Sequence, residues 1–322
     1  MSLSPSKSTS KNALSASDPA PRAAASNTVI QGVAWMVACT FAFVAVTGIV
    51  RYIGSDLPAA QAAFIRYAMG IVIMAPAIYA LIKNPPTGAI WRQNAIRGFA
   101  HSFGVILWFF AMARIPIAEV TAIGYSTPIF VTLGAALFLG ERLRLRRIGG
   151  VLAALLGALI ILRPGFEEIS IGQMAQLAAG PLFACSYLMT KSLTGKTDPR
   201  TIVTLLTIFC TLFLMPFALW DWQTPTLHDV FWLFVTACCA TFGHFAMTKA
   251  LAAAPISVTQ PITFLQLIWA TMLGYFVFSE SVDPYVILGG AIIVGAATFI
   301  SHREAKLARG AITPPASATK FN

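Results

Sequence analysis

Polar side chains recur at helical spacing inside two apolar runs of the sequence. The run over residues 117–139 carries positions spaced i, i+4, i+7 and i+11: Thr121, Tyr125, Pro128 and Thr132. The run over residues 256–279 carries positions spaced i, i+4 and i+7: Thr259, Thr263 and Gln266. Each set falls on one face of a helix. Two such faces could line a cavity that binds a polar solute, or they could hydrogen-bond to each other across packed helices.

Two prolines lie in the same runs. Pro128 and Pro261 have no N–H to offer the carbonyl groups of Gly124 and Ser257 one helical turn earlier. In hydrocarbon such a carbonyl needs another donor, so a broken turn tends to line a cavity. A kink that improves helix packing explains the prolines equally well.

Aromatic and histidine residues are further candidates for contact with a solute. Trp108 and Tyr187 could stack against a planar substrate, although both residue types are also common at the membrane–water interface. His101 and His244 could relay a proton or bind substrate. Hydrogen-bonded packing is the more ordinary role of a helical histidine, so both roles stay open.

Arg66 lies inside an apolar run, where a charge is costly and therefore informative. Its depth in the run over residues 58–82 is about 12 Å, at 1.5 Å of helical rise per residue. We expect Arg66 to pair with a backbone carbonyl or with a carboxylate such as Glu119. The contact could be structural or part of a substrate site.

No pattern in the sequence is typical of an enzyme or a metal site. The chain lacks a GxSxG nucleophile elbow, an HExxH zinc motif and a nucleotide-binding loop with its lysine. Its five cysteines all lie inside apolar runs, and no pair has CxxC spacing. We therefore expect no catalytic residue, no cofactor, no metal and no ATP-driven step within this chain.

The composition indicates that a lipid bilayer surrounds most of the chain. Hydrophobic residues make up 57% of the 322 residues, charged residues make up 11%, and the mean hydropathy is +0.75. We predict an all-α integral membrane protein with ten transmembrane helices. The apolar runs are 29–50, 58–82, 94–113, 117–139, 147–163, 171–190, 201–220, 230–252, 256–279 and 284–301.

Basic residues are distributed unevenly between the connecting segments. The segments on the side of the termini carry most of them: Lys7, Lys11, Arg22, Lys83, Arg92, Arg142, Arg144, Arg146, Arg147, Lys191, Lys196, Arg200, Arg303, Lys306, Arg309 and Lys320. The opposite loops collect acidic residues: Asp56, Glu167, Glu168, Asp221, Asp229 and Asp283. The positive-inside rule then predicts ten helices with both termini cytoplasmic. The net charge of +10 reflects this topology, and we expect no nucleic-acid partner.

The second half of the sequence repeats the first. Residues 103–161 match residues 242–300 without a gap, at an offset of 139. Each unit then contains five helices, and the odd number gives the two units opposite orientations in the membrane. The predicted organisation is a disordered cytoplasmic tail over 1–28, a first five-helix repeat over 29–163, a second, inverted repeat over 171–301 and a cytoplasmic tail over 302–322.

Glu141 and Glu280 occupy matching positions in the two units, each at the end of an apolar run. A shared structural role explains why both units keep the carboxylate. We expect it to accept hydrogen bonds from the start of the following helix, where the helix dipole favours an anion. Coupling of the protein to an ion is the alternative.

These features resemble a known family. Each unit has a proline-containing turn, "ARIPIAEVTAIGYSTPIF" and "AAAPISVTQPITFLQ", followed by the matched glutamate and a glycine-rich helix. Over about residues 29–301, the pattern is similar to EamA-type members of the drug/metabolite transporter superfamily. The resemblance implies a central cavity, alternating access and transport of a small organic metabolite. An amino acid or related compound is the first candidate, and riboflavin or S-adenosylmethionine are alternatives.

The expected partners are a metabolite, the lipid bilayer and either a coupling proton or a counter-solute. The sequence leaves the direction of transport and the oligomeric state open. Two other classes of function are alternatives, namely an intramembrane enzyme and a non-transporting scaffold. An enzyme would need a converging nucleophile or acid–base pair, which the sequence does not offer.

Overall fold

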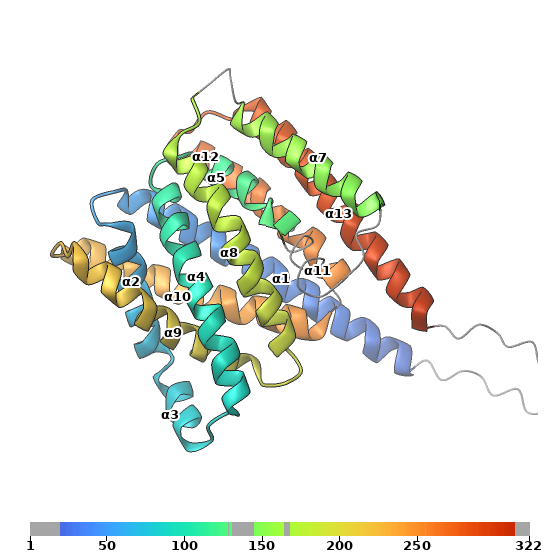
Figure 1. The fold of residues 1–322 in the computed structure, drawn as a ribbon, viewed down its shortest axis with the longest axis horizontal. Coiled ribbons are helices and arrows are strands. Elements are labelled where there is room, and N and C mark those ends of the chain that lie inside the picture. The colour runs from blue at the N-terminus through green and yellow to red at the C-terminus, as the bar shows by residue number, and fades with distance from the viewer. Residues whose placement is uncertain (1–19, 128, 131–144, 164–167, 255, 313–322) are drawn as a thin grey trace, which may run out of the picture.

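The computed structural model describes residues 20–127, 129–130, 145–163, 168–254 and 256–312. Over these ranges the chain is helical and has no β-strand, apart from an isolated bridge between Thr194 and Thr197. Figure 1 shows the helices gathered in one bundle. They are α1 (Ala20–Ile53), α2 (Ala59–Ile73), α3 (Ala75–Lys83), α4 (Gly88–Met112), α5 (Ile117–Gly124), α7 (Leu145–Leu162), α8 (Ile171–Leu193), α9 (Pro199–Trp220), α10 (Leu227–Ala253), α11 (Ile256–Thr263), α12 (Leu265–Phe278) and α13 (Pro284–Ile312).

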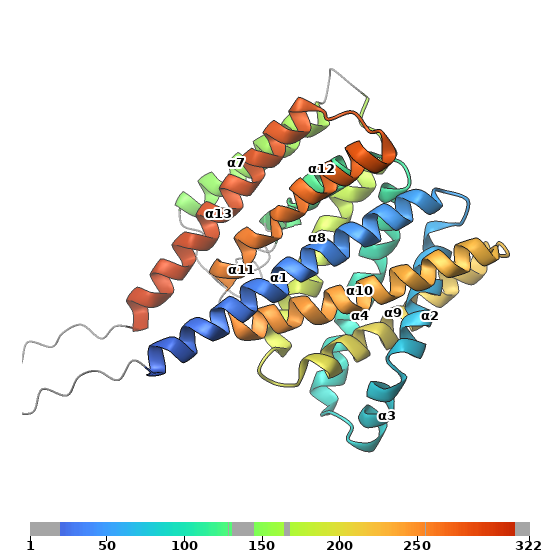
Figure 2. The same cartoon turned by 180° about the vertical axis from the view of Figure 1, so that it is seen from behind.

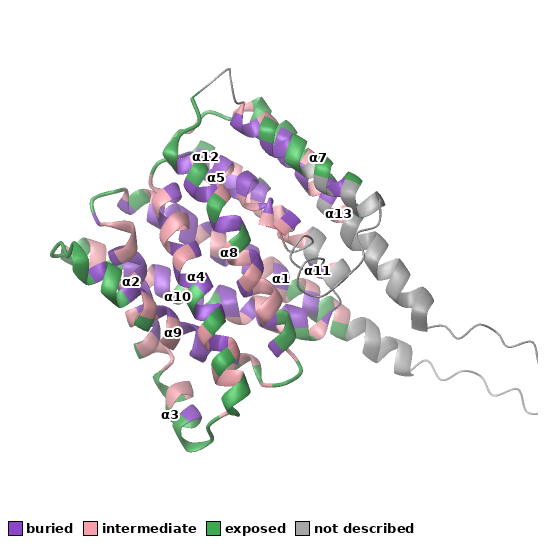
Figure 3. Ribbon diagram, viewed as in Figure 1, coloured by how far each residue is buried: buried purple, intermediate pink, exposed green. Residues whose placement is uncertain are grey.

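Within the described ranges, four helices are long and apolar enough to cross a membrane. These spans are Thr28–Ile53, Gly88–Met112, Pro199–Trp220 and Leu227–Ala253. The pair α2 and α3 adds a fifth span, bent by 65° at the break between them. Large apolar side chains are exposed on other helices (Figure 3), including Leu152 and Leu156 on α7 and Tyr275 and Phe276 on α12. Exposed apolar surface of this extent suits contact with lipid, and the protein is a multi-pass integral membrane protein.

The predicted helix over residues 58–82 is interrupted at Met74. Pro76 lies in the first turn of α3 and cannot donate to the carbonyl group of Val72. The chain therefore bends between α2 and α3, and the predicted run over residues 58–82 is a bent pair of helices that can form one span.

The predicted helices over residues 117–139 and 256–279 are interrupted as well. α5 ends at Gly124, the residue whose carbonyl Pro128 cannot bond, and Pro128 itself lies outside the described residues. The second run is divided at Phe264, between α11 and α12. The first break begins at the turn that Pro128 interrupts, whereas α11 continues past Pro261 and ends at Thr263.

Several helices extend beyond the predicted boundaries. α1 begins at Ala20, so the predicted disordered tail over 1–28 is helical from that residue, and residues 1–19 lie outside the described ranges. α13 continues to Ile312, into the predicted tail after 301. α4 begins at Gly88, although residues 91–94 are mostly polar, which is why hydropathy places its start later.

Side chains cap the starts of three helices. Ser170 and Gln173 form a reciprocal capping box at the start of α8, and Thr226 forms another at the start of α10. The Asp198 carboxylate accepts from two backbone N–H groups at the start of α9. Each cap satisfies N–H groups that have no partner within the helix.

The helices pack in pairs from different parts of the chain. Figures 1 and 2 show α1 against α10, α4 against α8, and α7 against α13 at one side of the bundle. The α7–α13 contact is made by backbone: a Cβ atom added to Gly289 would lie 2.5 Å from the carbonyl oxygen of Gly157. Small residues allow such close approach in membranes. The start of α1 and the end of α13 leave the bundle at the same end.

Candidate functional site

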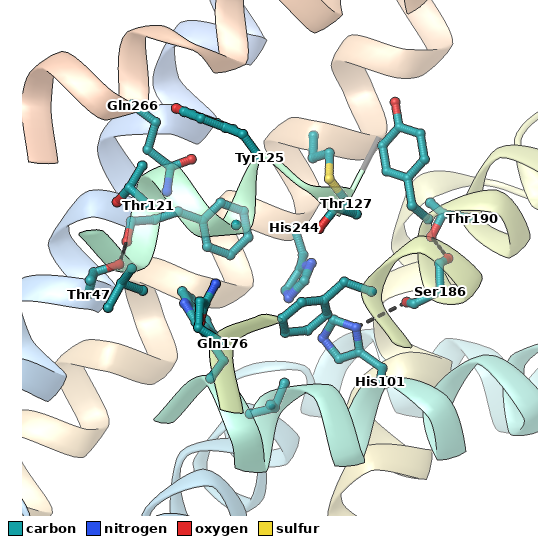
Figure 4. Close-up of a pocket in the computed structure, with 18 of the residues that line it drawn as sticks. Thr47, His101, Thr121, Tyr125, Thr127, Gln176, Ser186, Thr190, His244 and Gln266 are labelled. Carbon is teal, nitrogen blue, oxygen red and sulfur yellow. Dashed lines mark hydrogen bonds between the residues drawn. The ribbon is translucent and has the colours of Figure 1, made fainter. Parts of the chain in front are cut away.

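A cavity of about 240 Å³ lies among α1, α2, α4, α5, α8, α10 and α12. Figure 4 shows polar side chains directed into it from opposite sides. The contributing helices come from both halves of the sequence. Polar side chains are costly to bury inside a membrane protein, so a cavity lined by several of them indicates a binding site. This cavity is therefore the candidate functional site.

Hydroxyl and amide groups gather at one side of the cavity. They belong to Thr47, Thr121, Tyr125, Gln176 and Gln266 (Figure 4). Thr47 and Thr121 each donate their hydroxyl proton to a carbonyl of the preceding helical turn, at 2.9 Å. Their oxygen lone pairs can still accept, and the buried Oε1 atom of Gln176 has no hydrogen-bond partner among the described residues. This side can bind a solute with both donors and acceptors.

Basic groups also line the cavity. Arg66 and Arg97, which are 4% and 1% exposed, line the cavity with His101 and His244. His101 Nδ1 lies 3.0 Å from the Ser186 hydroxyl oxygen, as Figure 4 shows. The Nδ1 atom of His244 has no hydrogen-bond partner among the described residues.

Five rings form a closed circuit of edge-to-face contacts, which we call the ring circuit: His101, Phe183, Trp108, Phe43 and His244. Consecutive ring centroids are 5.1 to 6.3 Å apart, and the two histidine rings close the circuit at 5.3 Å. The rings come from α1, α4, α8 and α10. Edge-to-face contacts at these distances stabilise the packing of the rings and give the cavity an aromatic wall.

Eight residues singled out from the sequence line this one cavity. They are Arg66, His101, Trp108, Thr121, Tyr125, Tyr187, His244 and Gln266. Thr259 is fully buried but does not line the cavity. Thr263 contributes its backbone carbonyl, which accepts from the Tyr125 hydroxyl at 2.9 Å, and its side chain lies outside the lining. Thr132 and Glu141 lie outside the described residues.

Of the two kinds of partner expected for Arg66, a carbonyl or a carboxylate, the described residues show no ion pair with Glu119. The Glu119 carboxylate instead accepts from the side-chain amide of Gln173. The Arg66 guanidinium lies over the ring of Tyr67, 4.0 Å from its centroid. Glu119 is in the first turn of α5, where the helix dipole stabilises its negative charge, so the carboxylate does not need an arginine partner.

Glu280 does accept a hydrogen bond from the start of a helix, but the prediction of which helix donates it is wrong. Its Oε2 atom accepts from the backbone N–H of Ile117 at 2.9 Å, which is the start of α5 in the other half of the chain. Its Oε1 atom accepts from Arg51 Nε at 3.1 Å. We expected the donor to be the next helix in sequence, α13. Glu280 follows α12, and α12 packs against α5, so the start of α5 donates instead. Glu280 therefore joins α1, α5 and α12.

The turn that directs Glu280 requires a left-handed backbone. Ser279 follows α12 with φ of 53°, and the N–H of Glu280 donates to the carbonyl of Gly274 at 3.0 Å. Glycine is preferred at this position, and Gly140 stands at the matching position of the first half. Ser279→Gly is expected to raise the free energy of unfolding by about 0.5 kcal/mol, since relief of strain outweighs the added chain entropy. Detergent-induced unfolding measures this, and a loss of stability would contradict it.

Sequence reasoning missed several lining residues, of which Arg97 is the most informative. The predicted helix began at residue 94, which put Arg97 about 5 Å from its end. α4 begins at Gly88, which puts Arg97 about 13 Å inside. Thr47, Gln176, Ser186 and Thr190 were also missed, because single polar residues in an apolar run do not show which side of the helix faces the cavity.

A model of the EamA-like transporter family matches the chain over residues 30–163 and again over residues 170–302. The chain belongs to the EamA-like transporter family. The resemblance carried by the proline-containing turns is thereby confirmed, and the family match covers the cavity-forming helices of both halves.

Relatives of this EamA-like transporter carry chemically different solutes. A riboflavin transporter of Vibrio cholerae is 31% identical, over 87% of this chain and 96% of the relative. An S-adenosylmethionine uptake transporter of Rickettsia bellii is 25% identical, over 85% and 94%. A pseudopaline exporter of Pseudomonas aeruginosa is 27% identical, over 85% and 96%. A solved crystal structure of a 16% identical protein has a TM-score of 0.53, covers 90% of this chain and 99% of that chain, and shows likeness of fold alone.

Proposed function

We propose that this EamA-like transporter moves a small organic metabolite across the bacterial inner membrane by alternating access. The observation that carries the proposal is the cavity, whose polar lining comes from both halves of the chain: Thr121 and Arg66 from the first, Gln176, His244 and Gln266 from the second. A site between two units is exposed to either side of the membrane as the units rock against each other.

The proposed architecture is a pair of inverted five-helix units with ten membrane helices. The double match of the family model supports two units. The exit of α1 and α13 from the same end of the bundle supports termini on one side of the membrane. The uneven distribution of basic residues supports the cytoplasm as that side. The bent and broken helices then each count as one crossing.

Two substrate classes follow from the lining. The hydroxyl and amide groups suit an amino acid or a related compound. The ring circuit favours a planar solute, and riboflavin is the planar substrate named for one relative. The named relatives are transporters, which supports transport over the alternative of an intramembrane enzyme.

Reconstitution of the full-length protein in liposomes tests the proposal. A panel of amino acids, riboflavin and S-adenosylmethionine is offered with and without a proton gradient, and uptake is compared with that of empty vesicles. Faster movement of at least one solute is expected. Equal rates for every solute, in both directions, would contradict transport and favour a scaffold.

Removing a hydrogen-bonding group from the cavity is expected to impair transport. Gln266→Leu and Thr121→Val should each reduce the transport rate about tenfold, because a solute polar group would lose its buried partner. The matched control is Thr271→Val on α12. The Thr271 hydroxyl also donates to a carbonyl of the preceding helical turn, but Thr271 does not line the cavity. Normal transport by both cavity variants, or an equal loss in the control, would show that the site lies elsewhere.

A further inference from the structure

Two buried arginines face the cavity without a matching negative charge. Arg66 comes from α2 and Arg97 from α4, and the Nε atom of each has no hydrogen-bond partner among the described residues. One Nη atom of Arg97 donates to the carbonyl of Ile202 at 3.1 Å, and the Arg66 guanidinium lies over Tyr67. Both contacts leave the positive charges uncompensated.

No carboxylate from the described part of the chain lines this cavity. Neither arginine forms a salt bridge within the described ranges. Burying a guanidinium costs several kcal/mol unless an anion or a full set of acceptors compensates it. The cavity therefore carries two positive charges that a bound anion would stabilise.

Neutral donors surround the arginines. Tyr67 and His244 both line the cavity, and the Tyr67 hydroxyl and the His244 Nδ1 atom are buried without a hydrogen-bond partner among the described residues. A hydroxyl or imidazole N–H beside a guanidinium can donate to the same oxygen atoms. Four side chains from α2, α4 and α10 thus offer unused polar atoms to one region.

We propose that this cavity binds an organic anion. Arg66 and Arg97 hold its carboxylate group, Tyr67 and His244 donate to the same oxygens, and the ring circuit contacts its aromatic body. The proposal rests on the proposed transport function and specifies the class of solute. It sets this chain apart from a carrier selecting a cationic solute, since a positive group would be repelled by both guanidinium groups.

Three probes with the same ring and different charge test the assignment. Indole-3-acetate is an anion, indole-3-acetamide is neutral and tryptamine is a cation at pH 7. Binding of each to the purified full-length protein is measured by isothermal titration calorimetry. The acid is expected to bind about tenfold or more tightly than the amide, and tryptamine is expected to bind most weakly. Equal binding of acid and amide, or preference for the amine, would overturn the proposal.

Substitutions of the two arginines test whether they cause the preference for the acid over the amide. Arg66→Gln and Arg97→Gln should each weaken binding of indole-3-acetate about tenfold and change binding of the amide less than about threefold. Arg66→Lys keeps the charge and should retain part of the preference. Arg92→Gln, at an exposed position of α4, is the matched control and should behave like the wild type. An unchanged preference in both glutamine variants would overturn the assignment.

The probe series with the wild-type protein decides the question even if a glutamine variant fails to fold. Uptake of radiolabelled indole-3-acetate into liposomes separates this inference from the proposed function. Selective binding without uptake of any solute would contradict transport but support the anion site. Transport of riboflavin with equal binding of acid and amide would support transport and overturn the anion site.

Discussion

Glu280→Ala is expected to lower the free energy of unfolding by about 3 kcal/mol. The Glu280 carboxylate accepts one hydrogen bond from Arg51 and one from the backbone N–H of Ile117, and its side chain is only 10% exposed. Each hydrogen bond to a charged group contributes about 1.5–3 kcal/mol. Alanine leaves the Arg51 charge and the start of α5 without this acceptor. Unfolding of the purified protein by SDS titration in mixed micelles measures the loss.

A second ion pair provides the control. Arg163 donates to Asp283 at 2.5 Å, but these side chains are 23% and 29% exposed. Arg163→Gln is therefore expected to cost less than about 1 kcal/mol, because solvent partly screens a pair that is more accessible than Glu280. Equal losses in Glu280→Ala and Arg163→Gln would show that the contact with Ile117 adds nothing.

The same site distinguishes a structural glutamate from an ion-coupling one. Glu280→Gln keeps one oxygen that can accept from Ile117 but removes the charge opposite Arg51. A structural role predicts partial loss of stability and an unchanged pH profile of transport. A shifted pH profile at wild-type stability would assign ion coupling to Glu280 instead.

Gly289→Ala is expected to destabilise the protein by about 2 kcal/mol and to loosen the contact between α7 and α13. The added Cβ would lie 2.5 Å from the carbonyl oxygen of Gly157 and 2.6 Å from a side-chain carbon of Ile161. A backbone oxygen cannot move aside as a flexible side chain can, so the two helices must separate. Helix pairs in lipid depend on such close packing.

The identical substitution elsewhere on α13 isolates the contact. A Cβ atom at Gly295 meets nothing within 4 Å. Gly295→Ala should be neutral or stabilising by up to about 1 kcal/mol, because alanine favours the helix over glycine. The same detergent-induced unfolding experiment measures both variants. A loss in both, or in neither, would contradict the role of the Gly157–Gly289 contact.

Helical spacing identified part of the cavity, and particular breaks explain where it failed. Thr121 and Tyr125 lie in or next to α5 and line the cavity together. Thr263 and Gln266 were placed on one face, yet the helix is broken at Phe264 between them, so only Gln266 reaches the lining. A spacing rule holds only within one continuous helix.

The sequence by itself determined the environment and the family of this protein. Its apolar runs require a bilayer, since no soluble fold could cover them with polar surface, and its proline-containing turns carry the family resemblance. These are properties of short stretches of sequence, and they do not depend on how distant helices pack. The partners of Arg66, Arg97 and Glu280 depend instead on how helices distant in sequence rotate and cross. Only the tertiary structure decided that Glu280 contacts α5 rather than α13, and that two arginines from α2 and α4 face one cavity.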